Sequence, residues 1–127
     1  MKLLLDTHTF IWWDSDPSKL SKRALELLLN QENIRLVSVV SLWEIQIKTQ
    51  LGKLTLNQPL VKIINDQQNN GIEFIGINVN HILVLEQLPL YHKDPFDRLL
   101  IAQAKTEDAT LVSRDPVFSN YTIDIEW

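Results

Sequence analysis

The chain has 127 residues, 45% of them hydrophobic, which suits one domain that buries a core without disulfides or a structural metal. It contains no cysteine, which excludes thiol catalysis, zinc-thiolate sites and a disulfide framework. The net charge of −4 argues against a protein that coats nucleic acid, but it does not exclude a nuclease, because carboxylates around a metal count as negative in that sum.

The first predicted element is a buried strand at residues 2–6, in which three leucines lead directly into Asp6. This apolar run is too short for the core of a signal peptide and is ended by a charge. No segment approaches the ~20 consecutive apolar residues of a membrane span. We therefore expect a cytoplasmic protein with no membrane association.

The rest of the chain alternates between helical periodicity and short apolar or β-branched runs. Gly, Pro and Asn residues separate the segments, as is typical of turns and helix ends. In chain order we predict a helix at 7–13, a helix at 20–29, a strand at 34–38, a helix at 39–50, a helix at 59–65, a strand at 72–77, a helix at 79–88, a helix from 94 to 104, a strand at 109–113 and an edge strand at 121–125.

This alternation is typical of an α/β fold with a mainly parallel sheet. The sequence has no internal repeat, no low-complexity tract and no linker long enough to divide the chain. We therefore predict a single domain over residues 1–127.

Four acidic residues, Asp6, Glu44, Asp97 and Asp115, lie in apolar or conformationally constrained surroundings. Two of them follow predicted strands and two lie near predicted helix starts. In a parallel sheet the carboxyl ends of strands and the amino ends of helices lie on the same rim. A buried carboxylate is costly without a positive partner, and a Mg²⁺-type cation takes hard oxygen ligands. The pattern indicates a divalent-metal site assembled from distant parts of the chain.

Asp6 and Asp115 also have purely structural explanations. Asp6 could be the N-cap of the helix that follows it, since Asp is a favoured cap. Asp115 is followed by Pro116, and this pair fits a turn.

Glu44 and Asp97 likewise have explanations that need no metal. Glu44 could reach back to Ser41 in a capping box, or it could lie in the second turn of a helix capped by Ser38. Asp97 could be an acid favoured by the helix dipole in the first turn of a helix that is capped by Asp94.

The segments that carry these acids resemble, in order and over nearly the whole chain, a PIN domain (PilT N-terminus) of the VapC toxin type. The matching segments are residues 3–8, 38–45, 94–104 and 110–115. The resemblance implies a five-stranded parallel sheet of order 3-2-1-4-5 with helices on both faces. In that order the first and fourth strands are neighbours at the topological switch point, so Asp6 and Asp115 would face each other across the ligand crevice.

The resemblance also implies a Mg²⁺- or Mn²⁺-dependent endoribonuclease, the toxin of a type II toxin–antitoxin pair. Its acidic quartet would be Asp6, Glu44, Asp97 and Asp115, which would hold one or two ions. A bound cation acidifies water for attack on an RNA phosphodiester and offsets charge in the transition state. In this interpretation Asp6, Asp97 and Glu44 bind the principal metal directly or through water, and Asp115 completes the site or orients the water.

The same resemblance implies an RNA substrate, a cognate antitoxin that covers the site, and a homodimer. Arg98 and Arg114 are candidates to steer phosphate, with a salt bridge on the helix surface as the alternative. His92 is a weaker candidate for a phosphate contact, and no role is predicted for His8.

Two other functions compete with the nuclease. The chain could be a catalytically silent PIN-like module that engages a partner protein through its acidic rim. A phosphotransfer hydrolase with an aspartyl nucleophile would also carry Asp6 after the first strand, but that class needs a second Asp two positions on, where this chain has His8.

Overall fold

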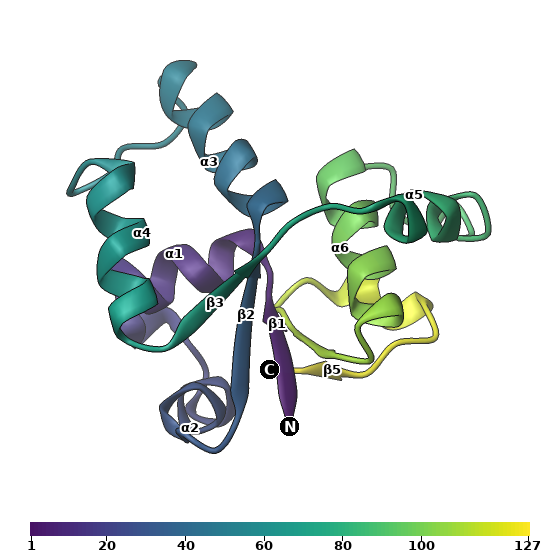
Figure 1. Cartoon of the computed structure of the whole chain (residues 1–127), viewed down its shortest axis with the longest axis horizontal. Helices are drawn as coiled ribbons and strands as arrows, with labels where there is room; N and C mark the ends of the chain where they lie inside the picture. The colour runs from purple at the N-terminus through teal and green to yellow at the C-terminus, as the bar shows by residue number, and fades with distance from the viewer.

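Five strands form one parallel sheet of order β3-β2-β1-β4-β5 in the computed structural model, which describes all residues 1–127 (Figure 1). The strand at the centre pairs with a parallel neighbour on each side, so that Leu5 lies opposite both Val37 and Val112. The strands are β1 Lys2–Leu5, β2 Ile34–Ser38, β3 Ile72–Ile75, β4 Thr110–Val112 and β5 Ile125–Glu126. The predicted fold class and strand order are confirmed.

Six α-helices and two 3₁₀ helices connect the strands. The 3₁₀ helices are η1 Pro17–Lys19 and η2 Pro116–Asn120. The α-helices are α1 Thr7–Ser15, α2 Lys22–Leu29, α3 Val39–Gln50, α4 Leu60–Asn69, α5 Val79–Leu85 and α6 Pro95–Thr106. No helix is both long enough and apolar enough to cross a membrane.

Helices cover both faces of the sheet, as predicted, because successive side chains of a strand point to opposite faces. Leu3 and Leu5 pack on one face with residues of α1, α2, α3 and α4. Leu4 packs on the other face with residues of α5, α6 and η2. Figure 1 shows the two sets of helices on either side of the central strands. The leucines of β1 are fully buried, so this strand is fixed in the core and holds Asp6, the next residue, at its carboxyl end.

The predicted edge strand at 121–125 is largely wrong, since β5 comprises only Ile125–Glu126. Tyr121 is buried, and its hydroxyl donates a hydrogen bond to the carbonyl oxygen of Pro89 at 2.8 Å. This segment therefore packs onto the loop before α6 and joins the sheet only at its end.

Other element bounds differ from the predictions by a few residues. The helix predicted at 59–65 continues to Asn69 and is followed by Gly71, which has a φ of +94°. The helix predicted at 79–88 ends at Leu85, where the backbone tightens so that the amide of Leu88 bonds the carbonyl of Leu85. These shifts arise at helix ends, where several turn geometries compete.

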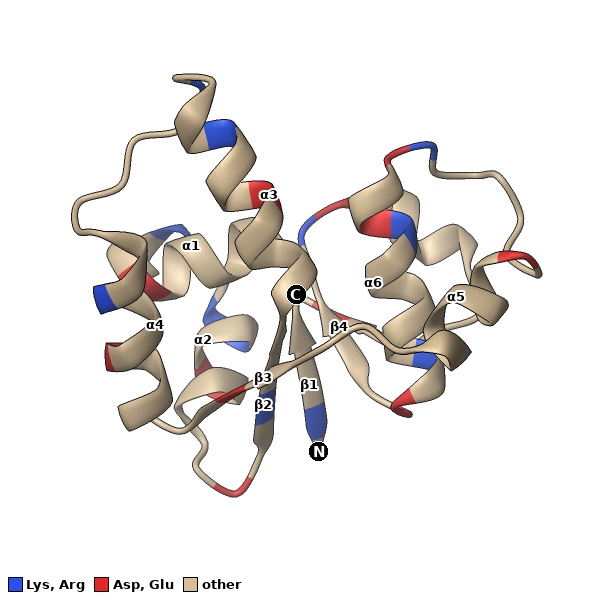
Figure 2. Cartoon of the chain, turned by 45° about the horizontal axis from the view of Figure 1, so that its top comes forward, with Lys and Arg blue, Asp and Glu red and all other residues tan.

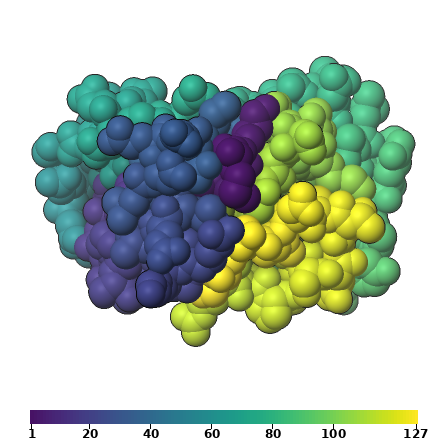
Figure 3. All heavy atoms as spheres, turned by 90° about the horizontal axis from the view of Figure 1, so that it is seen from below, coloured from purple at the N-terminus to yellow at the C-terminus, as the bar shows by residue number.

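The carboxyl end of β2 leads directly into α3, that of β1 reaches α1 after Asp6, and that of β4 reaches η2 after residues 113–115. Figure 3 shows the molecule from the opposite end, where the strands begin. The first residues of the chain lie there between its N-terminal and C-terminal parts, beside the last residues. Figure 2 shows acidic residues on α3 and near the start of α6 at the same end of the molecule. The rim predicted from the sequence is therefore one surface of the fold.

Candidate metal centre

Asp6 is both the N-cap of α1 and a buried carboxylate of the rim, with 6% of its surface exposed. Its Oδ1 accepts a hydrogen bond from the amide of Thr9 at 2.9 Å, so the capping explanation is correct. Its Oδ2 accepts a hydrogen bond from Ser113 Oγ at 2.6 Å. Burial raises the pKa of this carboxyl, and the hydrogen bonds from Ser113 and Thr9 offset only part of that rise. An added proton or cation would relieve this cost.

Glu44 lies in the second turn of α3, because Ser38 is the N-cap of that helix. The capping box with Ser41 is therefore wrong. Glu44 Oε1 accepts a hydrogen bond from Thr7 Oγ1 at 2.7 Å, and Oε2 forms an ion pair with Lys48 Nζ at 2.6 Å. Only 4% of Glu44 is exposed. This carboxylate thus already has a hydroxyl donor and an ammonium partner.

Asp97 lies in the first turn of α6, after the predicted cap Asp94, which is confirmed. Its pKa is raised to about 7, mainly because the carboxyl is buried and then because Asp94 is close. His92 acts in the opposite direction, while the charges of Glu44 and Asp6 raise the pKa further. The negative charges of Asp94, Glu44 and Asp6 therefore all act on the Asp97 carboxyl and disfavour its ionisation.

Asp115 is the N-cap of η2, where its Oδ1 accepts a hydrogen bond from the amide of Val117 at 3.0 Å, so the turn explanation is also correct. Its own amide donates to Ser113 Oγ at 3.0 Å. Since that hydroxyl donates to Asp6, Ser113 joins the carboxyl ends of β1 and β4. The other oxygen of this carboxylate, Oδ2, faces His92 in the loop before α6.

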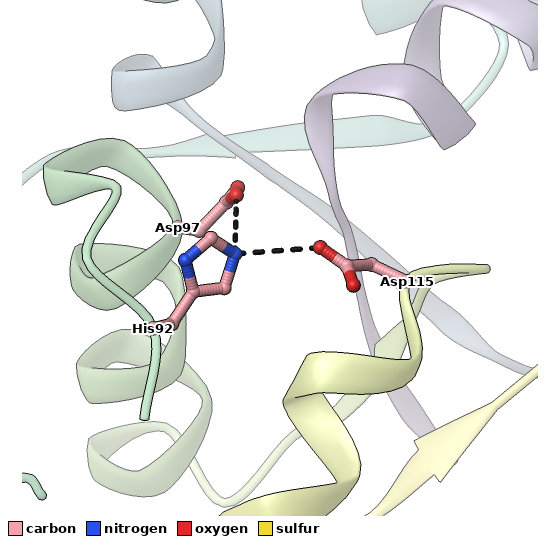
Figure 4. A group of neighbouring side chains, drawn as sticks. All are labelled: His92, Asp97 and Asp115. Atoms are coloured by element: carbon pink, nitrogen blue, oxygen red, sulfur yellow. Dashed lines mark hydrogen bonds and ion pairs between the residues drawn. The ribbon is translucent and has the colours of Figure 1, made fainter. Parts of the chain in front are cut away.

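His92 is the residue that brings Asp97 and Asp115 together (Figure 4). Its Nε2 lies 2.9 Å from Asp97 Oδ2 and 3.3 Å from Asp115 Oδ2. Nε2 and the nearest oxygens of the two carboxylates all lie within 4.8 Å of one another, so the carboxylates are close enough to share a cation. Asp6 and Glu44 are outside this group. They influence Asp97 through charge.

A cavity of about 340 Å³ opens beside the acids. Its walls include Asp6, Asp115 and Arg114, so two of the predicted acids share a space with one predicted phosphate-binding residue. The guanidinium of Arg114 lies 6.0 Å from the centre of the Trp12 ring, and His8 packs against the same ring at 5.8 Å. The cavity therefore combines acidic, basic and aromatic groups.

Arg98 contacts backbone carbonyls near the start of α6. It forms no salt bridge, and its guanidinium donates to four backbone carbonyls, those of Leu85 at 3.3 Å, Leu88 at 3.5 Å, Pro89 at 2.9 Å and His92 at 3.4 Å. The alternative of a salt bridge on the helix surface is therefore wrong. Arg98 ties the loop between α5 and α6 to the start of α6.

The position of His92 among the acids was missed by the sequence analysis. Its only sequence signal is its place two residues before the cap Asp94. Tyr121 contributes to this placement, because its hydroxyl accepts a hydrogen bond from the His92 amide at 2.8 Å. That contact joins residues 29 positions apart and has no local signature.

The donor set suits a divalent cation. Carboxylate oxygens are the ligands preferred by Mg²⁺ and Mn²⁺, and a cation offsets the repulsion between neighbouring acids. The raised pKa values of Asp6 and Asp97 show that the fold holds these groups where negative charge is unfavourable. The residues present therefore fit the metal that the resemblance implies.

Comparisons with known proteins point to one family. A sequence model of the PIN domain matches residues 3–123. The chain is similar to Ribonuclease VapC22 of Mycobacterium tuberculosis, with 26% identity over 114 residues that cover 89% of this chain and 86% of the relative.

The solved structures that share the fold include two VapBC complexes. One is VapBC2 from Rickettsia felis bound to a DNA fragment from their promoter, with a TM-score of 0.73 and 20% identity over 99% of this chain and 98% of that chain. The other is DNA-bound VapBC from Salmonella typhimurium, with a TM-score of 0.71 and 17% identity over 99% of this chain and 97% of that chain.

Proposed function

The chain belongs to the PIN domain family, and from this premise we propose that it is a divalent-metal-dependent endoribonuclease whose single domain spans residues 1–127. The similarity to a protein named Ribonuclease VapC22 supports RNA as the substrate. The observation that carries the proposal is the grouping of the acids at one rim: oxygens of Asp97 and Asp115 lie within 4.8 Å of each other, and Asp115 lines the same cavity as Asp6. The burial that raises the pKa of Asp97, together with the charges of Asp94, Glu44 and Asp6, agrees with this grouping. Such a concentration of acids at the open end of a parallel sheet is typical of a catalytic metal site.

In this proposal Asp6, Glu44, Asp97 and Asp115 hold Mg²⁺ or Mn²⁺. The cation, when bound, supplies an acidified water and offsets negative charge at the phosphodiester. The protein's own contribution is to hold the carboxylates in place before substrate arrives. Ser113 does this for Asp6 by donating its hydroxyl proton to Oδ2.

Thr7 has the corresponding role for Glu44, whose Oε1 accepts its hydroxyl proton. We assign the contact with a substrate phosphate to Arg114, which is exposed at the wall of the cavity next to Asp115. Arg98, the other predicted phosphate ligand, is assigned to positioning, because its N–H groups are directed at backbone carbonyls.

We further propose that the protein is the toxin of a type II toxin–antitoxin pair, with a cognate antitoxin as partner and a homodimer as its assembly. The resemblance to VapC toxins and the shared fold with proteins of VapBC complexes support this. Co-purification of the chain with the product of an adjacent gene, followed by loss of cleavage when that product is added, would test it.

A catalytically silent binding module is the second candidate. The ion pair between Glu44 and Lys48 favours it, because that carboxylate already has a cationic partner within the protein. The two candidates differ in their response to metal. A nuclease centre is stabilised by millimolar Mn²⁺ or Mg²⁺ in a thermal-unfolding assay, whereas a surface that only binds protein is not.

The decisive experiment compares cleavage of RNA by the wild-type protein and by Asp6→Asn, with Mg²⁺, with Mn²⁺ and with EDTA. Asn keeps an oxygen that can accept the capping hydrogen bond from Thr9, so the variant should fold as the wild type does. We expect metal-dependent cleavage by the wild type and none by the variant, with equal circular dichroism spectra. Full activity in the variant would end the proposal.

A further inference from the structure

The position of the ring proton of His92 follows from the hydrogen-bond partners of its two ring nitrogens. Nδ1 lies 3.2 Å from the backbone amide of Asp94, which is a donor under all conditions, so Nδ1 must present its lone pair. The ring proton is then on Nε2, which lies 2.9 Å from Asp97 Oδ2 and 3.3 Å from Asp115 Oδ2. The Nε2–H of His92 donates a hydrogen bond to Asp115 Oδ2, while Asp97 Oδ2 lies within ion-pair distance of the same nitrogen.

This arrangement is opposite to that of a metal-binding histidine. A ligating imidazole offers a lone pair to the metal and donates its other N–H to an acceptor. Here the nitrogen that faces the carboxylates carries the proton, and the other nitrogen faces an amide N–H. For Nε2 to bind a metal, His92 would have to change tautomer and give up its bond with Asp94.

Resting on the proposed metal site, we propose that His92 takes the place of the cation in the metal-free protein: its Nε2 lies between the carboxylates of Asp97 and Asp115, and the ring is displaced when a divalent ion binds them. The two oxygens that a shared cation would use are the same Oδ2 atoms that face the ring. A cation shared by these oxygens would compete with the partly positive ring N–H for the same negatively charged acceptors.

The backbone of His92 is held at both of its polar groups. Its carbonyl oxygen accepts a hydrogen bond from Arg98 at 3.4 Å, and its amide donates to the Tyr121 hydroxyl at 2.8 Å. The ring makes a tilted contact with Phe118, at 5.5 Å between ring centres, and 15% of the side chain is exposed. In this proposal the ring rotates away from the carboxylates while the backbone keeps these two hydrogen bonds.

The test measures Mn²⁺ affinity by isothermal titration calorimetry in the wild type, in His92→Ala and in the control Lys93→Ala, which removes the adjacent exposed basic side chain. We expect His92→Ala to bind Mn²⁺ more tightly by on the order of tenfold, because no hydrogen bond to a charged group has to be broken first. Lys93→Ala should change the affinity by less than about twofold.

A second measurement does not depend on the folding of His92→Ala. Pulsed electron paramagnetic resonance of bound Mn²⁺ detects a directly coordinated nitrogen, and it would be recorded in a His8→Ala background so that the histidine at the cavity wall cannot supply one. We expect no such nitrogen. A coordinated nitrogen, or weaker binding in His92→Ala, would make His92 a ligand and overturn the inference.

Two further outcomes separate this inference from the proposed function. Equal Mn²⁺ affinity in the wild type and in His92→Ala would overturn the role of His92 and leave the metal site intact. Absence of Mn²⁺ binding in both proteins would overturn the metal dependence of the proposed function and this inference with it.

Discussion

Replacement of Asp97 by Asn should stabilise the metal-free protein at alkaline pH. The pKa of this carboxyl is raised from 3.8 to about 7, so the folded state favours the neutral form. The neutral carboxyl favours the folded state. Its contribution to the free energy of unfolding is complete below pH ~4 and is lost as the pH rises through 7, because the folded state disfavours the charged form. Asn mimics the neutral form at every pH.

The raised pKa sets the size of the effect. A pKa rise from 3.8 to about 7 corresponds to an upper limit of roughly 4 kcal/mol, since each unit is worth about 1.36 kcal/mol. The Asp97 side chain is 21% exposed, so solvent screening reduces this figure. We expect Asp97→Asn to raise the free energy of unfolding by about 2 kcal/mol at pH 8.5 and to leave it nearly unchanged at pH 4.5.

Urea denaturation of both proteins in EDTA, at several pH values between 4.5 and 8.5, measures the difference. Added Mn²⁺ should reverse the order at high pH, because the cation stabilises the wild type and the variant has lost a carboxylate ligand. A difference that does not vary with pH, or a variant that is less stable at pH 8.5, would refute the electrostatic account of Asp97.

The two arginines predicted from the sequence to steer phosphate should respond in opposite ways. Arg114→Ala should raise KM for RNA several-fold and weaken its salt dependence, while the free energy of unfolding changes by less than about 1 kcal/mol, because the side chain is exposed and loses only a contact with Trp12. Cleavage kinetics at two salt concentrations check this, and an unchanged KM would contradict it. Arg98→Ala should lower the free energy of unfolding by about 2 kcal/mol, because four backbone carbonyls lose a charged donor. Thermal or urea unfolding measures that loss, and a variant as stable as the wild type would show that the loop does not depend on Arg98.

Much of the fold could be predicted because its signals are local. The buried leucines of β1, the cap at Asp94 and the helix of α6 depend on residues within a few positions of one another. The edge strand was misplaced because Tyr121 is directed by a contact with Pro89, 32 positions away. A tertiary contact overrode the local β-branched pattern in that segment.

The same division holds for the candidate metal centre. The sequence by itself determined which carboxylates lie at the rim, because a parallel sheet brings strand ends and helix starts to one side. Only the tertiary structure decided that His92 lies between Asp97 and Asp115 and that Arg98 faces backbone carbonyls. The physical reason is that strand and helix signals repeat over a few residues, whereas side-chain contacts across 23 positions depend on how a loop packs on the finished fold.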